Sequence, residues 1–123
     1  MATESELVVD RFIQAWSRRN IDEIMTFFAD DAVYHNIPMA PAQGKDAIRA
    51  VINSFLPMAR AVEFKVLKSA SAGDTVLNER IDIFDMGAKR VELPVAGVFE
   101  VRGGKIAAWR DYFDLAMWTK QMS

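Results

Sequence analysis

The sequence predicts an α+β fold in which a strongly curved, mixed but mostly antiparallel sheet and three to four helices enclose a pocket. Two observations support this prediction. Apolar residues recur with a helical period in the first half of the chain, and they alternate as in strands from about residue 62 onwards. Short turns separate the alternating segments, which is typical of successive antiparallel hairpins. Helices that precede such a sheet can cover one face of it and leave a pocket between the layers.

Three helices are expected in the first half of the chain. The first covers residues 5–18, because its apolar side chains recur on one face. The second covers residues 21–28, and Asn20 before it can cap the backbone N–H groups of its first turn. The third covers residues 45–56 and ends at Pro57, which cannot continue a helix.

The remaining elements are mainly strands. A short strand is expected at residues 32–37, after a turn at 30–31 and before a proline-containing loop at 38–44. A short closing helix is expected at 115–122, and the whole chain, residues 1–123, is expected to form one domain. The four longer strands are expected at residues 62–70, 75–85, 90–101 and 105–114.

The composition excludes several classes of function. A net charge of -2 argues against nucleic-acid binding, which usually requires a clustered basic patch. The chain has no cysteine and one histidine, so a thiolate nucleophile is excluded and a metal site is not expected. No apolar run approaches the roughly 20 residues that span a membrane, and no signal-peptide core follows the N-terminus. We therefore expect a soluble, cytoplasmic protein.

Polar residues share one face of the strand at 75–85. Because side chains alternate along a strand, Asn78, Arg80, Asp82 and Phe84 point to one side. The other side carries Leu77, Glu79, Ile81 and Ile83. An arginine and an aspartate two residues apart can pair along this face. The pair is either part of an active site or an ordinary structural or surface ion pair.

A third charged residue lies on the last strand. Trp109, Asp111 and Phe113 share one face, so Asp111 points inward if its aromatic neighbours do. The alternative is a solubilising charge on an edge strand. In the strand at 32–37, Tyr34 and Asn36 oppose His35, and the sequence alone leaves open which of these faces is buried.

These residues together resemble the limonene-1,2-epoxide hydrolase family, within the wider NTF2-like and SnoaL-like group. Three segments carry the resemblance, at residues 34–38, 79–82 and 109–114, and the segments at 44–47 and 97–99 fit as well. The resemblance covers nearly the whole chain. It implies an NTF2-like cone, a homodimer and an enzyme that needs no cofactor.

The resemblance also implies roles for five residues. Asp82 would be the general acid and Asp111 the general base, with Arg80 between them, while Tyr34 and Asn36 would position the attacking water. Two carboxyl groups in one apolar pocket tend to share a single proton, which suits such a division of labour. The expected reaction is the addition of water to an epoxide in one step, which gives a vicinal diol without a covalent intermediate.

Bulky apolar side chains are candidates for the pocket wall and suggest a compact apolar epoxide, such as a cyclic alkene oxide or a terpene oxide. The outer face of the last four strands is left open and invites dimerisation. The candidates for the wall are Ile13, Trp16, Phe55, Phe84, Leu93, Val95, Phe113 and Trp118.

Two other functions fit the same fold. One is a SnoaL-like polyketide cyclase or ketosteroid-isomerase-like enzyme, which moves protons next to a carbonyl without an Asp–Arg–Asp bridge. The other is a binding module for a small ligand with no catalytic activity, since a fold does not determine a function. Arg80 is the residue that distinguishes epoxide hydrolysis from the first of these.

Overall fold

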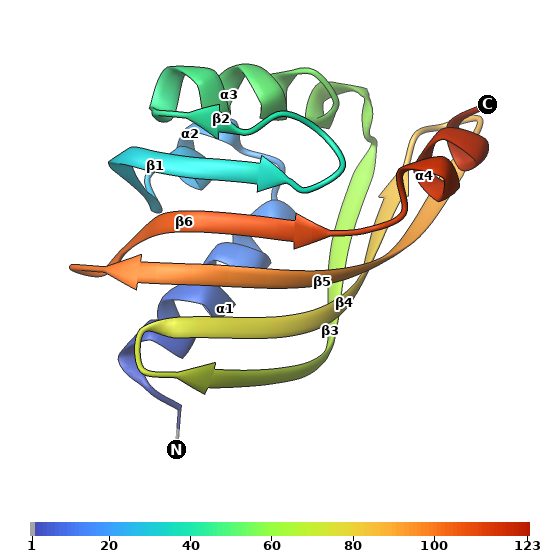
Figure 1. The fold of residues 1–123 in the computed structure, drawn as a ribbon. Coiled ribbons are helices and arrows are strands. Elements are labelled where there is room, and N and C mark those ends of the chain that lie inside the picture. The colour runs from blue at the N-terminus through green and yellow to red at the C-terminus, as the bar shows by residue number, and fades with distance from the viewer. Residues whose placement is uncertain (1) are drawn as a thin grey trace.

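The computed structural model describes residues 2–123 and contains a six-stranded sheet that α1 crosses on one face (Figure 1). No helix in this range is long and apolar enough to cross a membrane. The helices are α1 (Glu4–Trp16), α2 (Ile21–Met25), α3 (Lys45–Asn53) and α4 (Leu115–Met122), with a 3-10 turn, η1 (Leu56–Met58). The strands are β1 (Phe28–Asn36), β2 (Ala42–Gln43), β3 (Ala61–Ala72), β4 (Thr75–Asp85), β5 (Arg90–Arg102) and β6 (Lys105–Tyr112).

The sheet has the strand order β2-β1-β6-β5-β4-β3. The four strands β3 to β6 pair antiparallel with their neighbours along the chain, as three successive hairpins require. Strand β1 runs parallel to β6, so the sheet is mixed. The predicted α+β class and mostly antiparallel sheet are therefore confirmed.

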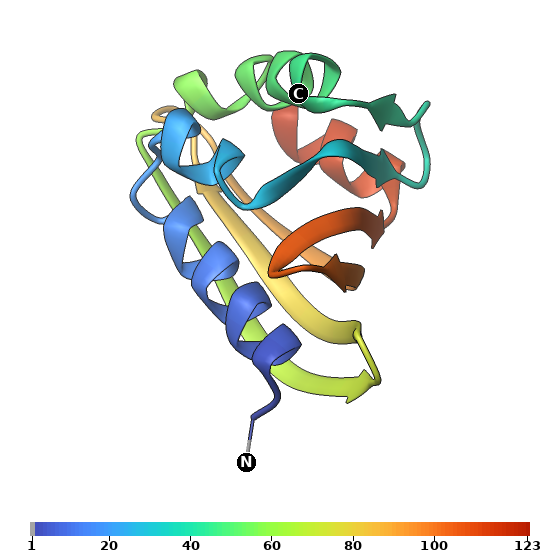
Figure 2. The same cartoon turned by 90° about the vertical axis from the view of Figure 1, so that its left-hand side faces the viewer.

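The sheet curves around α1, as Figure 2 shows from the side. Strands β3, β4 and β5 are long, and irregularities in pairing occur between Val66 and Lys68 and between Glu100 and Val101. Such bulges increase the local twist and bend a strand. The curvature leaves room between the sheet and the helices at the end where α3 and α4 lie.

An aromatic cluster joins α1 to the sheet. Phe12 and Trp16 lie on the buried face of α1 and are fully buried. The Phe12 ring meets Trp109 edge-on, at 4.9 Å between centroids, and Trp16 stacks on Phe64 at 4.9 Å. Offset and edge-on aromatic pairs add about 0.5–1.5 kcal/mol each beyond the burial of their area. This cluster packs on the face of β6 that also carries Asp111.

The second helix and the first strand differ from the prediction. Helix α2 ends at Met25, and Phe28 already begins β1, opposite Ile106 of β6. Asp30 and Asp31, which were expected to form a turn, lie within β1 and are exposed. A short apolar run fits a helix or a strand equally well, and here pairing with β6 decides between them. The two-residue strand β2, within the expected loop at 38–44, pairs with β1 and was not predicted.

Two element ends also differ from the prediction, and both matter for the pocket. Helix α3 ends at Asn53 instead of residue 56, and Pro57 lies in η1. Phe55 is therefore free of the helix. Strand β6 ends at Tyr112, so Asp114 is not a strand residue; its side chain accepts a hydrogen bond from the backbone N–H of Ala116 at 2.9 Å and caps α4.

Candidate active site

Strand register brings four residues into one row across the sheet. Asn36 of β1 is opposite Asp111 of β6, Asp111 is opposite Gly97 of β5, and Gly97 is opposite Asn78 of β4. Because neighbouring strands lie about 4.8 Å apart, this row spans roughly 15 Å of the concave face. Tyr34 lies two residues before Asn36 on the same side of β1 and is buried, which answers the question that the sequence left open.

Arg80 connects the two carboxyl groups. Its Nε and Nη2 atoms donate to the two oxygens of Asp82, each at 2.9 Å, in a bidentate pair. The same Nη2 donates to Asp111 Oδ2 at 2.8 Å, so one nitrogen bridges both carboxylates. Nη1 donates to Asn78 Oδ1 at 2.9 Å. Planar bidentate pairs of this kind fix orientation as well as charge.

The ion cluster is buried. Arg80 has no exposed surface, and Asp82 and Asp111 are each 4% exposed. The guanidinium carbon of Arg80 lies 5.1 Å from the ring centre of Phe64 and 5.9 Å from that of Phe99. A cation between aromatic faces is stabilised by their negative π surfaces. A surface ion pair, which the sequence left as an alternative, is therefore wrong for Arg80 and Asp82.

Trp109 holds the second oxygen of Asp111. Its indole N–H donates to Asp111 Oδ1 at 2.7 Å, so each oxygen of this carboxylate accepts one strong hydrogen bond. The Trp109 ring is fully buried and stacks on Tyr34 with 4.2 Å between centroids and an interplanar angle of 11°. One indole therefore contacts both Asp111 and Tyr34.

Burial sets the protonation of the two carboxyl groups. Burial raises the pKa of Asp82 to about 6, because the charge of Arg80 and its hydrogen bonds only partly offset the loss of solvent and because Asp111 is close. Burial also raises the pKa of Asp111, against the opposing effects of Arg80 and Trp109. With both pKa values raised and one arginine between them, the pair favours a state with a single proton.

Two further groups keep their ordinary protonation states. Burial alone would lower the pKa of Arg80, but the charges of Asp111 and Asp82 raise it above its usual value, so the guanidinium stays charged. Burial and the charge of Asp111 raise the pKa of Tyr34, which keeps its hydroxyl protonated as a hydrogen-bond donor. The site therefore offers a fixed cation, a neutral hydroxyl and one exchangeable proton.

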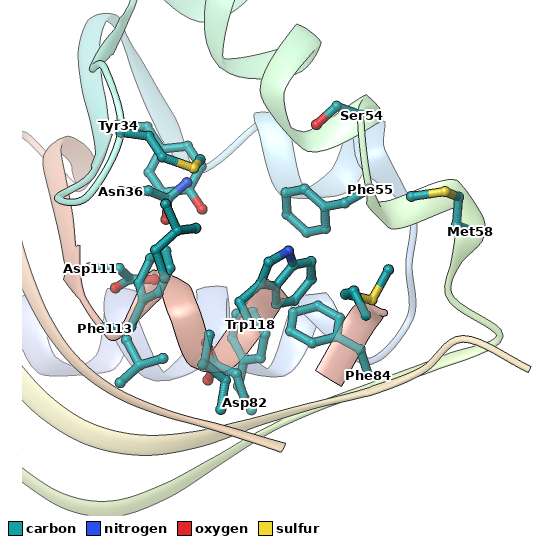
Figure 3. Close-up of a pocket in the computed structure, with 16 residues that line it drawn as sticks. Tyr34, Asn36, Ser54, Phe55, Met58, Asp82, Phe84, Asp111, Phe113 and Trp118 are labelled. Atoms are coloured by element: carbon teal, nitrogen blue, oxygen red, sulfur yellow. The ribbon is translucent and has the colours of Figure 1, made fainter. Parts of the chain in front are cut away.

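A cavity of about 290 Å³ opens beside these groups (Figure 3). Tyr34, Asn36 and Asp111 lie on one side of it, and Phe55, Phe84 and Trp118 lie together on another. The lining is mostly apolar, with a few polar groups, as in sites for small organic molecules. The lining residues are Tyr34, Asn36, Met39, Ser54, Phe55, Met58, Phe64, Asp82, Phe84, Leu93, Val95, Asp111, Phe113, Leu115, Trp118 and Met122.

Two of the eight residues expected at the wall lie elsewhere. Ile13 and Trp16 do not line the cavity, because α1 packs against the sheet beyond it and directs both side chains into the core. Trp16 stacks on Phe55 and Phe64, which do line the cavity, so it supports the wall from behind. The six expected residues that line the cavity are Phe55, Phe84, Leu93, Val95, Phe113 and Trp118.

Three residues of the cluster were not among the predicted site residues. Asn78 and Trp109 each lie two positions before a charged residue, Arg80 and Asp111 respectively, and their alternation signal was present in the sequence. Their hydrogen bonds to these neighbours depend on rotamers that alternation does not give. The importance of Gly97 depends on cross-strand register, which local sequence reasoning does not provide.

Comparisons with known proteins agree with this geometry. The family model described as the limonene-1,2-epoxide hydrolase catalytic domain matches residues 3–123. The chain belongs to the limonene-1,2-epoxide hydrolase family. Epoxide hydrolase EphG of Mycobacterium tuberculosis is 33% identical over 107 residues, which are 87% of this chain and 71% of that protein.

Comparison with solved structures gives the fold class of this chain. A limonene-epoxide-hydrolase-like epoxide hydrolase from M. tuberculosis superposes with a TM-score of 0.84 at 31% identity, over 97% of this chain and 90% of that chain. An NTF2-like protein of unknown function from Burkholderia pseudomallei gives a TM-score of 0.87 at 15% identity, over 99% of both chains, and shares the fold alone. The fold is NTF2-like, and the chain is an epoxide hydrolase of the limonene-1,2-epoxide hydrolase type.

Proposed function

We propose that this epoxide hydrolase adds water to a compact apolar epoxide in one step and releases a vicinal diol. Asp82 is the general acid, Asp111 is the general base, and Arg80 holds both. The observation that carries this proposal is the single nitrogen, Arg80 Nη2, which lies 2.9 Å from Asp82 Oδ2 and 2.8 Å from Asp111 Oδ2. The two carboxyl groups face one cavity and share one cation, as an acid and a base acting together require.

The step balances in protons and bonds. A water oxygen bonds to one epoxide carbon while the bond from that carbon to the epoxide oxygen breaks. Asp111 takes a proton from the water, and Asp82 gives its proton to the departing oxygen. Transfer of one proton from Asp111 back to Asp82, directly or through solvent, restores the enzyme. Each general acid or base typically contributes about 10²–10⁴-fold to the rate.

Tyr34 and Asn36 are proposed to hold the attacking water beside Asp111. Asn36 is opposite Asp111 in the strand pairing, and Tyr34 is its neighbour on the same face. The Tyr34 hydroxyl stays protonated because burial raises its pKa, and an Asn amide offers both a donor and an acceptor. A water held by these groups has its oxygen free to attack and a proton directed to Asp111.

The cavity supports a compact apolar substrate. A volume of about 290 Å³ is at the lower end of ordinary ligand pockets, which hold about 300–1,000 Å³. The aromatic group Phe55, Phe84 and Trp118 occupies the wall across the cavity from Tyr34, Asn36 and Asp111 (Figure 3). A cyclic alkene oxide or a terpene oxide, with its epoxide beside Asp82 and its ring against the aromatic side chains, satisfies both constraints.

The experiment that tests this function is a single turnover in ¹⁸O-labelled water. Enzyme in excess is incubated with limonene oxide or with cyclohexene oxide, and the diol and the protein are both analysed by mass spectrometry. Direct attack by water gives label in the diol and none in the protein. Unlabelled diol with labelled protein would reveal a covalent ester intermediate and overturn the one-step mechanism.

Two variants separate this proposal from its rivals. Asp111→Asn keeps the size of the side chain and removes the base, so diol formation should fall to the uncatalysed rate. Arg80→Ala should abolish turnover as well. Full turnover by Arg80→Ala would show that hydrolysis does not depend on the bridge, and equal diol formation by Asp111→Asn would remove its role as the base.

We further propose that two chains associate through the outer face of the sheet. This face carries exposed or half-exposed apolar side chains on neighbouring strands, including Leu77 at 45% exposure and Tyr112 at 46%. Large exposed apolar surfaces often mark interfaces between protein chains. The patch lies on the face opposite the cavity, so association would leave the access to the site open.

A further inference from the structure

The most tightly constrained position near the carboxyl pair is a glycine. A side chain at Gly97 has no space: a Cβ there would overlap Arg80 Nη1 and lie 2.9 Å from both Asn78 Oδ1 and Asp111 Oδ1. Contacts below 3.0 Å essentially do not occur for a real Cβ. Glycine weakens a strand interior, so its presence in the middle of β5 requires a reason.

The reason is space and not backbone conformation. The glycines with positive φ are 44, 73, 87, 103 and 104, and Gly97 is not among them. It pairs with Asn78 on one side and with Asp111 on the other, in regular register. An L-residue fits this backbone, and only the atoms above the strand exclude it.

The nearest of those atoms belongs to the guanidinium of Arg80, and the side-chain oxygens of Asn78 and Asp111 lie beside it. Strands β4 and β6 are separated by β5, so about 10 Å lie between the strand that carries Arg80 and the strand that carries Asp111. The arginine reaches Asp111 by crossing directly over Gly97. Asn78 lies two residues before Arg80 on β4. Its Oδ1 accepts a hydrogen bond from Nη1 at 2.9 Å and so fixes the guanidinium nitrogen that does not bind a carboxylate.

We propose that Gly97 and Asn78 are positioning residues. Together they form a seat that holds the Arg80 guanidinium so that Nη2 bridges the two carboxyl groups. This inference rests on the proposed roles of Asp82 and Asp111. Without the seat, the arginine stays paired with Asp82 on its own strand and withdraws from Asp111. Asp111 then loses the positive charge that opposes its burial, its pKa rises further, and a smaller fraction of it is ionised and able to act as a base.

Gly97→Ala is the first test. The kcat for epoxide hydrolysis at pH 7 should fall about 100-fold, the value for loss of one general base, with little change in KM. The acid limb of the pH profile of kcat/KM should move upward by about one unit or more, as expected when a carboxyl loses a neighbouring arginine. An unchanged kcat and acid limb would overturn the proposal.

Asn78→Ala provides a second variant that introduces no clash. It removes the acceptor of Nη1 and leaves space, so the protein should fold, with kcat lowered about 10-fold and the acid limb shifted in the same direction. If Gly97→Ala does not fold, this variant decides the question. An Asn78→Ala enzyme with the wild-type limb would show that the seat does not control Asp111.

A double-mutant cycle separates the seat from general damage to β5. Lysine at position 80 lacks the Nη1 atom that a side chain at 97 would meet. Gly97→Ala should therefore lower the midpoint of thermal unfolding (Tm) much less in the Arg80→Lys background than in the wild type. Equal losses in both backgrounds would overturn the proposal. The Tm readout does not depend on turnover. Failure of the labelled-water experiment would therefore reject the proposed mechanism, and the Tm coupling between positions 80 and 97 would still test the seat.

Discussion

The indole N–H of Trp109 donates to Asp111 Oδ1 at 2.7 Å, on the opposite oxygen from the one that Arg80 holds. The same ring stacks on Tyr34. Both oxygens of Asp111, the proposed base, therefore accept a hydrogen bond. The Trp109 ring that donates one of them also packs against Tyr34, which is proposed to hold the water. This arrangement fixes the direction in which Asp111 can accept a proton.

Trp109→Phe should weaken catalysis without destroying the fold. Phenylalanine retains an aromatic surface for Tyr34 but lacks the donor, so the pKa of Asp111 rises and its carboxylate gains freedom to rotate. A lost hydrogen bond to a charged group is worth about 1.5–3 kcal/mol, so kcat should fall roughly 10-fold or more. The measurement is the pH profile of kcat/KM, whose acid limb should move to higher pH.

Trp16→Phe is the matched control for this variant. Trp16 is fully buried in the same aromatic cluster, with its ring centre 5.7 Å from that of Trp109, but its Nε1 has no hydrogen-bond partner among residues 2–123. The same truncation there removes an N–H that makes no bond. The acid limb should stay in place, and an identical shift in both variants would attribute the effect to loosened packing and not to the hydrogen bond.

The pKa of Asp82, the proposed acid, predicts how kcat/KM falls at alkaline pH. Asp82 must carry a proton to act, and its pKa is raised to about 6. The protonated fraction of a group falls tenfold per pH unit above its pKa, so kcat/KM should decline from about pH 6 upward, with a midpoint that belongs to the coupled pair. A rate that is independent of pH between 5 and 9 would contradict an acid of this kind.

Protein stability should depend on pH in the opposite way from that expected for a salt-bridged carboxylate. The pKa of Asp82 is higher in the folded state than its ordinary value of 3.8, so folding favours its protonated form. Its stabilising contribution is complete below about pH 4 and is lost as the pH rises through about 6. Asp82→Asn removes this loss, so the Tm of the variant relative to wild type should rise between pH 4 and 7.5. A constant difference in Tm would show that the pKa is not raised.

Much of this site can be predicted from the alternation of side chains along the strands. It placed Arg80 and Asp82 on one face of a strand and Asp111 between two inward aromatic residues, because the strand period is exact wherever one face is buried. The bounds expected for the strand at 75–85 and for the helix at 115–122 agree with β4 and α4. Both segments are flanked by turn or capping residues with clear local preferences.

Features that depend on distant contacts were not predictable in this way. The second helix was extended to residue 28, because nothing local reveals that Phe28 pairs with Ile106 of β6. Trp16 was assigned to the pocket wall, because periodicity shows that a side chain is buried but not what it contacts. The meeting of Gly97 with Arg80 requires the register of three strands at once.

Association through the outer sheet face predicts a charge-sensitive dimer. Leu77 lies on that face, on a strand in the middle of the patch, and a glutamate there would bury an unpaired charge. Leu77→Glu should convert a particle with the mass of two chains into one with the mass of a single chain, as measured by light scattering after size-exclusion chromatography. Met117→Glu, at a similarly exposed apolar position on α4, is the control and should leave the mass unchanged.

The size of the cavity predicts a limit on substrate size that one side chain sets. Trp118 of α4 lines the cavity and meets Phe84 edge-on with 5.5 Å between centroids, so it closes the aromatic side of the wall. Trp118→Ala should enlarge the cavity and raise kcat/KM for bulky epoxides relative to cyclohexene oxide, because the small substrate loses packing while the large one gains space. Met117→Ala, on the adjacent residue that does not line the cavity, should leave this ratio unchanged. If both variants leave the ratio unchanged, α4 does not define the substrate limit, and the compact-substrate assignment loses its structural basis.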